Sequence, residues 1–190
     1  MAESGLDSLR ETHAIQVEWR AYELRPAGLP PPDPEEVESF RRYVLKAWPR
    51  VQAIARERFG LELRREEDIH HRPTRLAHIG AKFAAEHGQG PAYHRAVFKA
   101  HWQDLQDISD AETLAGLARG LGLDEAGFRA ALDDPRYAEQ VERDEYWAYQ
   151  EGLGGVPAFI FGNRYLVSGA QPVEVLRQAA DRCLQEGRVL

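Results

Sequence analysis

Strand-type patterns lie near the two ends of this sequence, and a long block with helical spacing separates them. Residues 15–24 alternate apolar and polar side chains, which is the period-2 signature of a strand. Residues 158–161 and 165–167 form two short apolar runs around a Gly-Asn turn, which predicts a hairpin. A closing helix follows from Pro172. This order predicts an α/β fold in which an all-helical insertion interrupts a sheet domain.

The boundary of the insertion is set by a proline-rich connector at residues 26–34, in which the chain must run extended. We therefore assign residues 31–135 to the helical insertion subdomain. Residues 1–30 and 136–190 then make up the sheet domain.

The first helix of the insertion has clear start and stop signals. Asp33 is a natural N-cap, Pro34 suits the first helical position, and Gly60 ends the helix. The apolar stripe behind this cap predicts a face turned toward the core, and it consists of Val37, Phe40, Val44, Trp48, Val51, Ala55 and Phe59. Other helical patterns run over Leu6 to His13, 74–87, 91–103, 111–120, from Asp124, and from Pro135 toward Gly152.

The balance of charge argues against a nucleic-acid partner. The 190 residues carry 24 Lys and Arg against 31 Asp and Glu, a net charge of −7, whereas nucleic-acid binding needs clustered basic residues. No apolar run approaches the roughly 18 residues that a bilayer span needs. The first residues also lack the basic and apolar regions of a secretory signal. We therefore expect a soluble cytoplasmic protein with no nucleic-acid and no membrane partner.

A single cysteine, Cys183, limits the redox chemistry of the chain. One thiol cannot form an intrachain disulfide, a CxxC pair or a cysteine-rich zinc site. Cys183 falls in register with Val173, Leu176 and Ala180 on the apolar face of the closing helix. This register predicts a buried, inert thiol, and a nucleophilic role is the alternative.

The seven histidines do not form a metal-binding motif. His94 and His101 lie two helical turns apart, near 10 Å, which is too far for two zinc bonds of about 2 Å without other ligands. His70, His71 and His78 add no HExxH pattern. We expect no metal and no cofactor. The four tryptophans fall in or beside apolar stripes and are predicted to pack in the core; they are Trp19, Trp48, Trp102 and Trp147.

Several short motifs occur in a distinctive order. Residues 155–161 read Gly-Val-Pro-Ala-Phe-Ile-Phe, and residues 168–172 read Ser-Gly-Ala-Gln-Pro. Upstream motifs lie at Thr74, Ala77-His78, Phe98-Lys99-Ala100, Asp107-Ile108 and Leu121-Gly122-Leu123. Together they resemble the DsbA-like proteins of the thioredoxin fold, and in particular the cytoplasmic FrnE-like branch of disulfide oxidoreductases and isomerases. The resemblance covers about residues 15–188.

This resemblance implies a first strand and a CxxC, or a variant with serine, upstream of residue 6, and neither is present. The fold class that it implies is an α/β thioredoxin-like fold, lacking its first strand, with an all-helical insertion. A missing interior strand would leave buried backbone groups without partners, at roughly 1–3 kcal/mol each. We expect either a longer gene product or a natural form without the thiol site, whose gap a partner's strand or a repacked N-terminus fills.

The resemblance also implies a substrate-binding role for part of the chain. In such folds a cis-proline, here Pro157, turns the backbone of the preceding residue, Val156, toward an extended substrate. His101 and Trp102 are expected to face the cleft between the insertion and the sheet domain, where substrate would lie; an interfacial histidine without that role is the alternative. No catalytic residue is assigned, because the CxxC is absent.

Three functions remain open on this basis. The first is a DsbA-like thiol-disulfide oxidoreductase family protein that is redox-inactive as written and whose partners are protein or peptide thiols and disulfides. The second is a non-catalytic peptide- or partner-binding module, with a homodimer as one form. The third is a protein similar to the glutathione-dependent isomerases, which use serine at the first helix.

Overall fold

The computed structural model describes residues 2–26, 33–65 and 73–189. The chain divides into two compact units, one made of residues 1–24 and 147–190 and the other of residues 25–146. Most of the proline-rich connector lies outside the described residues, and so do both His70 and His71. The boundaries that we drew from the sequence at residues 31 and 135 stay a prediction.

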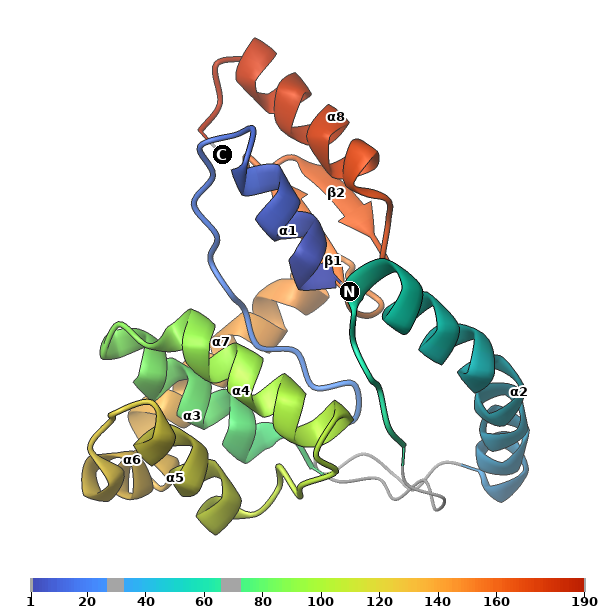
Figure 1. The fold of residues 1–190 in the computed structure, drawn as a ribbon. Helices are drawn as coiled ribbons and strands as arrows, with labels where there is room; N and C mark the ends of the chain where they lie inside the picture. The colour runs from blue at the N-terminus through green and yellow to red at the C-terminus, as the bar shows by residue number, and fades with distance from the viewer. Residues whose placement is uncertain (1, 27–32, 66–72, 190) are drawn as a thin grey trace. The chain divides into compact units, whose positions relative to one another are not determined.

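The first unit is a hairpin covered by two helices (Figure 1). Strands β1 (Ala158–Phe161) and β2 (Tyr165–Ser168) pair antiparallel. Helices α1 (Ala2–Arg10) and α8 (Val173–Gln185) pack against each other, and residues of both join one core with the hairpin. The buried members of this core are Leu9, Phe161, Leu176, Ala180 and Cys183. The predicted hairpin and closing helix are therefore confirmed.

The turn of the hairpin depends on two residues with left-handed backbone conformations. Gly162 and Asn163 both have φ of 54°, a conformation that glycine and asparagine tolerate best. The N–H of Arg164 donates to the carbonyl oxygen of Phe161 at 3.0 Å and closes the turn. A side-chain contact also joins the N-terminal and C-terminal segments of this unit. Nε2 of His13 lies 3.1 Å from a carboxylate oxygen of Asp181.

The second unit is helical. It contains α2 (Pro34–Phe59), α3 (Arg75–Glu86), α4 (Gly90–Trp102), α5 (Ala111–Gly120), α6 (Glu125–Leu132) and most of α7 (Pro135–Gln150). Asp33, Asp110 and Asp124 each accept a backbone N–H at a helix start, so the predicted N-cap at Asp33 is confirmed.

The core of the second unit is built on aromatic side chains from four helices. The ring of Phe83 on α3 makes edge contacts with Phe128 at 5.6 Å and Tyr137 at 5.9 Å between ring centroids. Tyr93 on α4 contacts the same Phe128 at 5.6 Å. These contacts hold α3, α4, α6 and α7 together, and Tyr93 and Phe128 are fully buried.

A buried ion pair adds to this packing. The ammonium group of Lys82 on α3 donates to the Asp144 carboxylate on α7, and both side chains are largely shielded from water. Removal of either partner of a buried ion pair leaves the other charge uncompensated, which lowers the stability of the folded protein.

The prediction of a strand at residues 15–24 is wrong, because these residues form no hydrogen-bonded strand in the structure. The alternation itself is present, since Ile15, Val17, Trp19 and Ala21 are at least half-buried and the residues between Ile15 and Ala21 include exposed Gln16, Glu18 and Arg20. A strand also needs a hydrogen-bonded neighbour, and the only ladder within the described residues joins β1 to β2. Alternation of apolar and polar residues indicates which side chains face the core, but it does not show that a second strand lies beside them.

The predicted core-facing stripe of α2 is also wrong at both ends of the helix. Val37 is 40% exposed, Phe40 is 51% exposed and Phe59 is 37% exposed, and Ala55 is the one buried residue of the helix in the described part of the chain. The tryptophans likewise are half-buried rather than in the core. Trp48 on α2 stacks on Trp102 with ring centroids 5.9 Å apart. Helical spacing identifies the apolar face, but it does not show whether another element covers that face.

Candidate functional site

The segment that enters β1 carries the first two predicted site residues. The Val156–Pro157 peptide bond is cis, and Val156 is 51% exposed. The approach to this segment is fixed by hydrogen bonds. The N–H of Leu153 donates to the carbonyl oxygen of Ala148 at 2.9 Å, and the hydroxyl of Tyr22 donates to the Leu153 carbonyl oxygen at 3.2 Å. Val156 is therefore presented at the surface by an anchored loop.

The register of the hairpin decides where the backbone of β1 points. The N–H of Gly169 donates to the carbonyl oxygen of Pro157 at 2.8 Å. Residues on an antiparallel strand alternate between bonding to the partner strand and pointing away from it. Phe159 and Phe161, which lie two and four residues after Pro157, therefore bond toward β2. The backbone groups of Ala158 and Ile160 point to the opposite edge.

This opposite edge of β1 is open in the structure. Among residues 2–26, 33–65 and 73–189, no strand pairs with it, and no backbone hydrogen bond to Ala158 or Ile160 occurs from that side. The sequence did not single out Ala158 and Ile160 as site residues. Only the parity of the register, set by Gly169 and Pro157, identifies them.

The other two predicted site residues lie at the end of α4 in the second unit. The His101 ring contacts the Trp102 indole edge-on, with centroids 4.6 Å apart. The carbonyl oxygen of Trp102 accepts the N–H of Arg64 at 2.6 Å. The Arg65 guanidinium lies 6.0 Å from the centroid of the Trp48 ring, which itself stacks on Trp102. The structure thus places His101 and Trp102 in an aromatic cluster with Trp48 and Arg65, two residues that the sequence did not indicate as neighbours.

Cys183 is buried in the core of the first unit, as its register predicted. Burial raises the pKa of its thiol, and the nearby Glu186 carboxylate raises it further. A Cβ on Gly162 would lie 3.0 Å from the Cys183 sulfur, so the thiol is tightly enclosed on that side as well. Both effects work against formation of a reactive thiolate.

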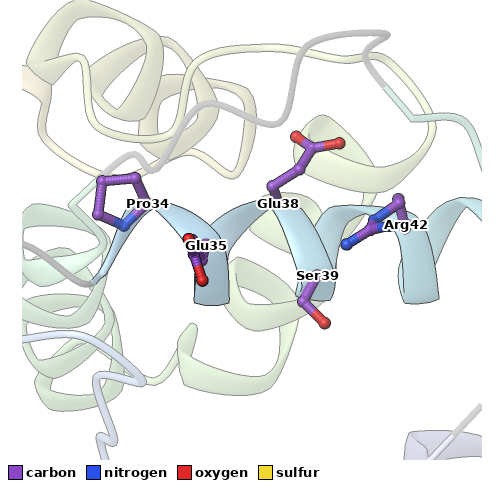
Figure 2. Close-up of a pocket in the computed structure, with 5 residues that line it drawn as sticks. All are labelled: Pro34, Glu35, Glu38, Ser39 and Arg42. Atoms are coloured by element: carbon purple, nitrogen blue, oxygen red, sulfur yellow. The ribbon is translucent and has the colours of Figure 1, made fainter.

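The described residues also contain a surface hollow on α2, but no cluster suited to a metal ion. Within the described ranges, no group of three or more His, Cys, Asp or Glu side chains is arranged to hold a metal ion. A hollow on α2 is lined by Pro34, Glu35, Glu38, Ser39 and Arg42 (Figure 2). These five residues come from the first turns of one helix and are all exposed, so the hollow is an open stretch of helix surface. None of the helices in the described part of the chain is long and apolar enough to cross a membrane.

Known proteins share the sequence pattern of this chain. Residues 1–181 match the family described as DSBA-like thioredoxin domain. The uncharacterized protein YwbO of Bacillus subtilis is 34% identical over 166 residues, which span 87% of this chain and 80% of YwbO. The thiol:disulfide interchange protein DsbA of Bordetella parapertussis is 31% identical over 78 residues, which span 41% of this chain and 37% of that protein.

Solved structures share the fold. A structure described as a probable DsbA oxidoreductase from Streptomyces coelicolor aligns with a TM-score of 0.81 and 32% identity, over 99% of this chain and 83% of that one. A 2-hydroxychromene-2-carboxylate isomerase aligns with a TM-score of 0.75 and 20% identity, over 98% and 90% of the two chains. These alignments confirm the predicted α/β thioredoxin-like class with a helical insertion.

Proposed function

Because this chain belongs to the DSBA-like thioredoxin domain family, we propose that its 190 residues bind extended protein or peptide segments and do not themselves exchange disulfides. The observation that carries the proposal is the state of Cys183. It is the single cysteine of the 190 residues, and it is enclosed in the core between α8 and the hairpin.

Thiol-disulfide exchange begins when a thiolate attacks one sulfur of a disulfide in line. The attacking sulfur must therefore be ionised and reachable. Cys183 meets neither condition, because burial raises the pKa of its thiol and no surface of the sulfur is exposed. The family chemistry thus has no nucleophile in this stretch of sequence.

The peptide-docking part of the proposal depends on Val156. Its position before the cis bond to Pro157 and its exposure suit the pairing of an extended segment. This interaction uses main-chain N–H and C=O groups and needs no cysteine. We include His101 and Trp102 in the proposal as substrate-contacting residues, because they combine an imidazole with a half-buried pair of stacked indoles. A cytoplasmic location is part of the same proposal.

The redox half is tested by a disulfide-reduction assay with the purified 190-residue chain, insulin as substrate and dithiothreitol as reductant. The expected rate equals the rate without protein, and Cys183→Ala leaves it unchanged. Turnover that Cys183→Ala abolishes would show Cys183 to be the nucleophile and would contradict the proposal.

The binding half is tested by fluorescence anisotropy with the insulin B chain, carboxymethylated at its cysteines and labelled with fluorescein. Blocked cysteines exclude covalent capture, so a saturable rise in anisotropy reports docking alone. Folded, disulfide-bonded insulin is the matched control, and it should not compete. The absence of saturable binding would contradict the docking proposal even if the redox result were as expected.

A further inference from the structure

The first half of α2 lies outside the packing of the second unit. Residues 33–40 are all exposed, so none of the side chains on the first two turns is buried by another element in the described part of the chain. The later turns are anchored instead. Trp48 stacks on Trp102, and the side-chain amide of Gln52 donates to the carbonyl oxygen of Leu63 at 2.8 Å. The helix is therefore held in its second half and presents its first half to solvent.

One side of this exposed helix is apolar. Phe40, Tyr43 and Ala47 follow one another at spacings of three and four residues, which is the spacing along which two helices pair. Phe40 is 51% exposed and Tyr43 is 69% exposed. The Arg25 guanidinium lies 6.0 Å from the centroid of the Phe40 ring and leaves half of that side chain open. Exposed Val37 widens the apolar area beside Phe40.

Charged residues of opposite sign lie at the two ends of this apolar area. Glu36 is two helical turns before Tyr43 and Arg50 is two turns after it, so both share its side of the helix. Both side chains are exposed, and neither forms an ion pair within the described residues. We name the surface made of Glu36, Phe40, Tyr43, Ala47 and Arg50 the α2 face. It is acidic at one end, apolar in the middle and basic at the other end.

We propose that the α2 face is the contact between two copies of this chain, paired antiparallel about a two-fold axis beside Tyr43. This inference goes beyond the proposed function and does not depend on it, because all of its residues lie on α2. A two-fold rotation that reverses the helix sets Glu36 of each copy opposite Arg50 of the other. It also sets Phe40 of each copy beside Ala47 of the other. The contact then has two ion pairs around an apolar centre.

The order of charges along the helix favours a second copy over other occupants. A surface that is acidic, apolar and then basic complements itself when it is reversed, which is what a two-fold axis provides. A parallel pair would instead place Glu36 against Glu36 and Arg50 against Arg50, and like charges repel. An anionic lipid surface is opposed by Glu35 and Glu36 at the start of the helix. One pair of helices buries less area than a standard interface, so we expect a dissociation constant on the order of 10 μM.

Sedimentation velocity of the full 190-residue chain, between about 1 and 200 μM, tests the contact. The unchanged chain should pass from monomer to dimer over this range. Phe40→Glu places a charge at the centre of the contact and should weaken association by at least about tenfold. Phe98→Glu is the matched control, because Phe98 on α4 is 52% exposed against 51% for Phe40, and it should leave the dimer in place. A chain that stays monomeric across this range, or a dimer that Phe40→Glu leaves intact, would overturn the proposal.

Charge reversal tests the antiparallel order. Glu36→Arg gives an α2 face with two basic ends and Arg50→Glu gives one with two acidic ends, so each variant alone should associate more weakly than the unchanged chain. An equimolar mixture of the two variants restores both ion pairs and should recover the dimer. A mixture that stays monomeric while both variants keep their helical circular dichroism would overturn the charge pairing. If either variant unfolds, the comparison of Phe40→Glu with Phe98→Glu decides.

A disulfide crosslink locates the two-fold axis. Tyr43→Cys brings two thiols together at the axis. Arg42→Cys, the control, places the thiol one residue earlier, turned about 100° around the helix and away from the α2 face. Copper phenanthroline as oxidant should convert the first variant into a covalent dimer and leave the second monomeric, and the native Cys183 is buried and does not compete. Equal crosslinking of the two variants would overturn the pairing about Tyr43.

Two further outcomes would assign the α2 face to another occupant. Phe40→Glu should bind the carboxymethylated insulin B chain with unchanged affinity; loss of that binding would place the peptide on the α2 face and overturn the dimer. A monomeric chain that floats with vesicles of equal phosphatidylcholine and phosphatidylglycerol, and does so only with Phe40 intact, would make a lipid surface the occupant. An intact dimer that binds no B chain supports this inference and removes only the proposed function.

Discussion

The hydroxyl oxygen of Tyr93 on α4 occupies the space beside Gly80 on α3, only 2.5 Å from where a Cβ on Gly80 would lie. The Phe128 ring is nearly as close, at 2.6 Å from the same point. Tyr93 is fully buried, and burial raises the pKa of its phenol well above the usual range. Glycine at position 80 therefore lets α3 and α4 approach closely over a rigid aromatic core.

We expect Gly80→Ala to destabilise the second unit. The added methyl group must displace the buried ring of Tyr93 or Phe128, and overpacking of this kind costs about 1–3 kcal/mol. Urea unfolding followed by circular dichroism measures the change. Gly116→Ala, inside α5, is the matched control, because nothing lies within 4 Å of its Cβ position and alanine favours a helix by about 0.5–1 kcal/mol. Equal effects of the two substitutions would contradict the packing argument.

The stability of the second unit should fall as pH decreases through the range in which His94 titrates. Burial, together with the smaller effects of the positive charges of His78 and Arg95, lowers the pKa of His94 to about 4. The unfolded chain takes up the proton near pH 6.5, whereas the folded protein resists protonation until about pH 4. The contribution of neutral His94 to the free energy of unfolding is therefore fully present above pH 6.5. It is lost as pH falls toward 4, and the loss is roughly 3 kcal/mol at most.

Denaturant titrations between pH 7.5 and 4 measure this loss. His94→Gln should flatten the profile over that interval, because glutamine does not titrate. His13→Gln, in the first unit, is the control and should leave the slope from His94 in place. An unchanged slope in His94→Gln would assign the pH dependence to other groups.

Breaking the Lys82–Asp144 pair should be costly. Lys82→Met leaves the buried Asp144 carboxylate without its ammonium partner, which costs about 3–5 kcal/mol for a buried pair. Arg143→Ala is the control, because Arg143 pairs with Glu139 in full contact with water and such a pair is worth about 0–1 kcal/mol. The double substitution of Lys82 and Asp144 by Met and Leu should cost less than Lys82→Met alone, as measured by urea unfolding.

The thiol of Cys183 should react with 5,5′-dithiobis(2-nitrobenzoate) only when the first unit opens. The raised pKa and full burial predict labelling roughly a hundredfold slower in the native protein than in urea. Ser168→Cys places a thiol at an exposed position of β2 in the same unit. This thiol should react rapidly in the native protein, so it serves as the control for Cys183. Rapid native labelling of Cys183 would contradict the enclosed core.

Local chemistry was sufficient to predict most of the elements. The start of α2 follows from Asp33 and Pro34, and its end follows from Gly60, because caps act within one turn. The hairpin follows from its two apolar runs and the Gly-Asn turn for the same reason. The register of Cys183 with Leu176 and Ala180 correctly placed the thiol in the core.

Features that depend on a distant partner could not be predicted. The alternation from Ile15 to Ala21 is present, but a strand also requires a neighbour at hydrogen-bonding distance. The stripe from Val37 to Phe59 is apolar, yet nothing in the spacing shows that both of its ends are exposed. At the site, Val156 and Pro157 came from the family resemblance. Ala158 and Ile160 required the register of the hairpin, which only the structure provides.

The core shared by α1 and α8 has a consequence for the order of events during synthesis. His13 and Asp181, which contact each other, are 168 positions apart, and Leu9 packs with residues of α8. The second unit, in contrast, draws all its aromatic core residues from Phe83 to Tyr137. On the ribosome, that unit can fold while the chain is still being made, whereas the first unit waits for its last helix. Until then Leu9 and Ile15 stay exposed to chaperones and proteases.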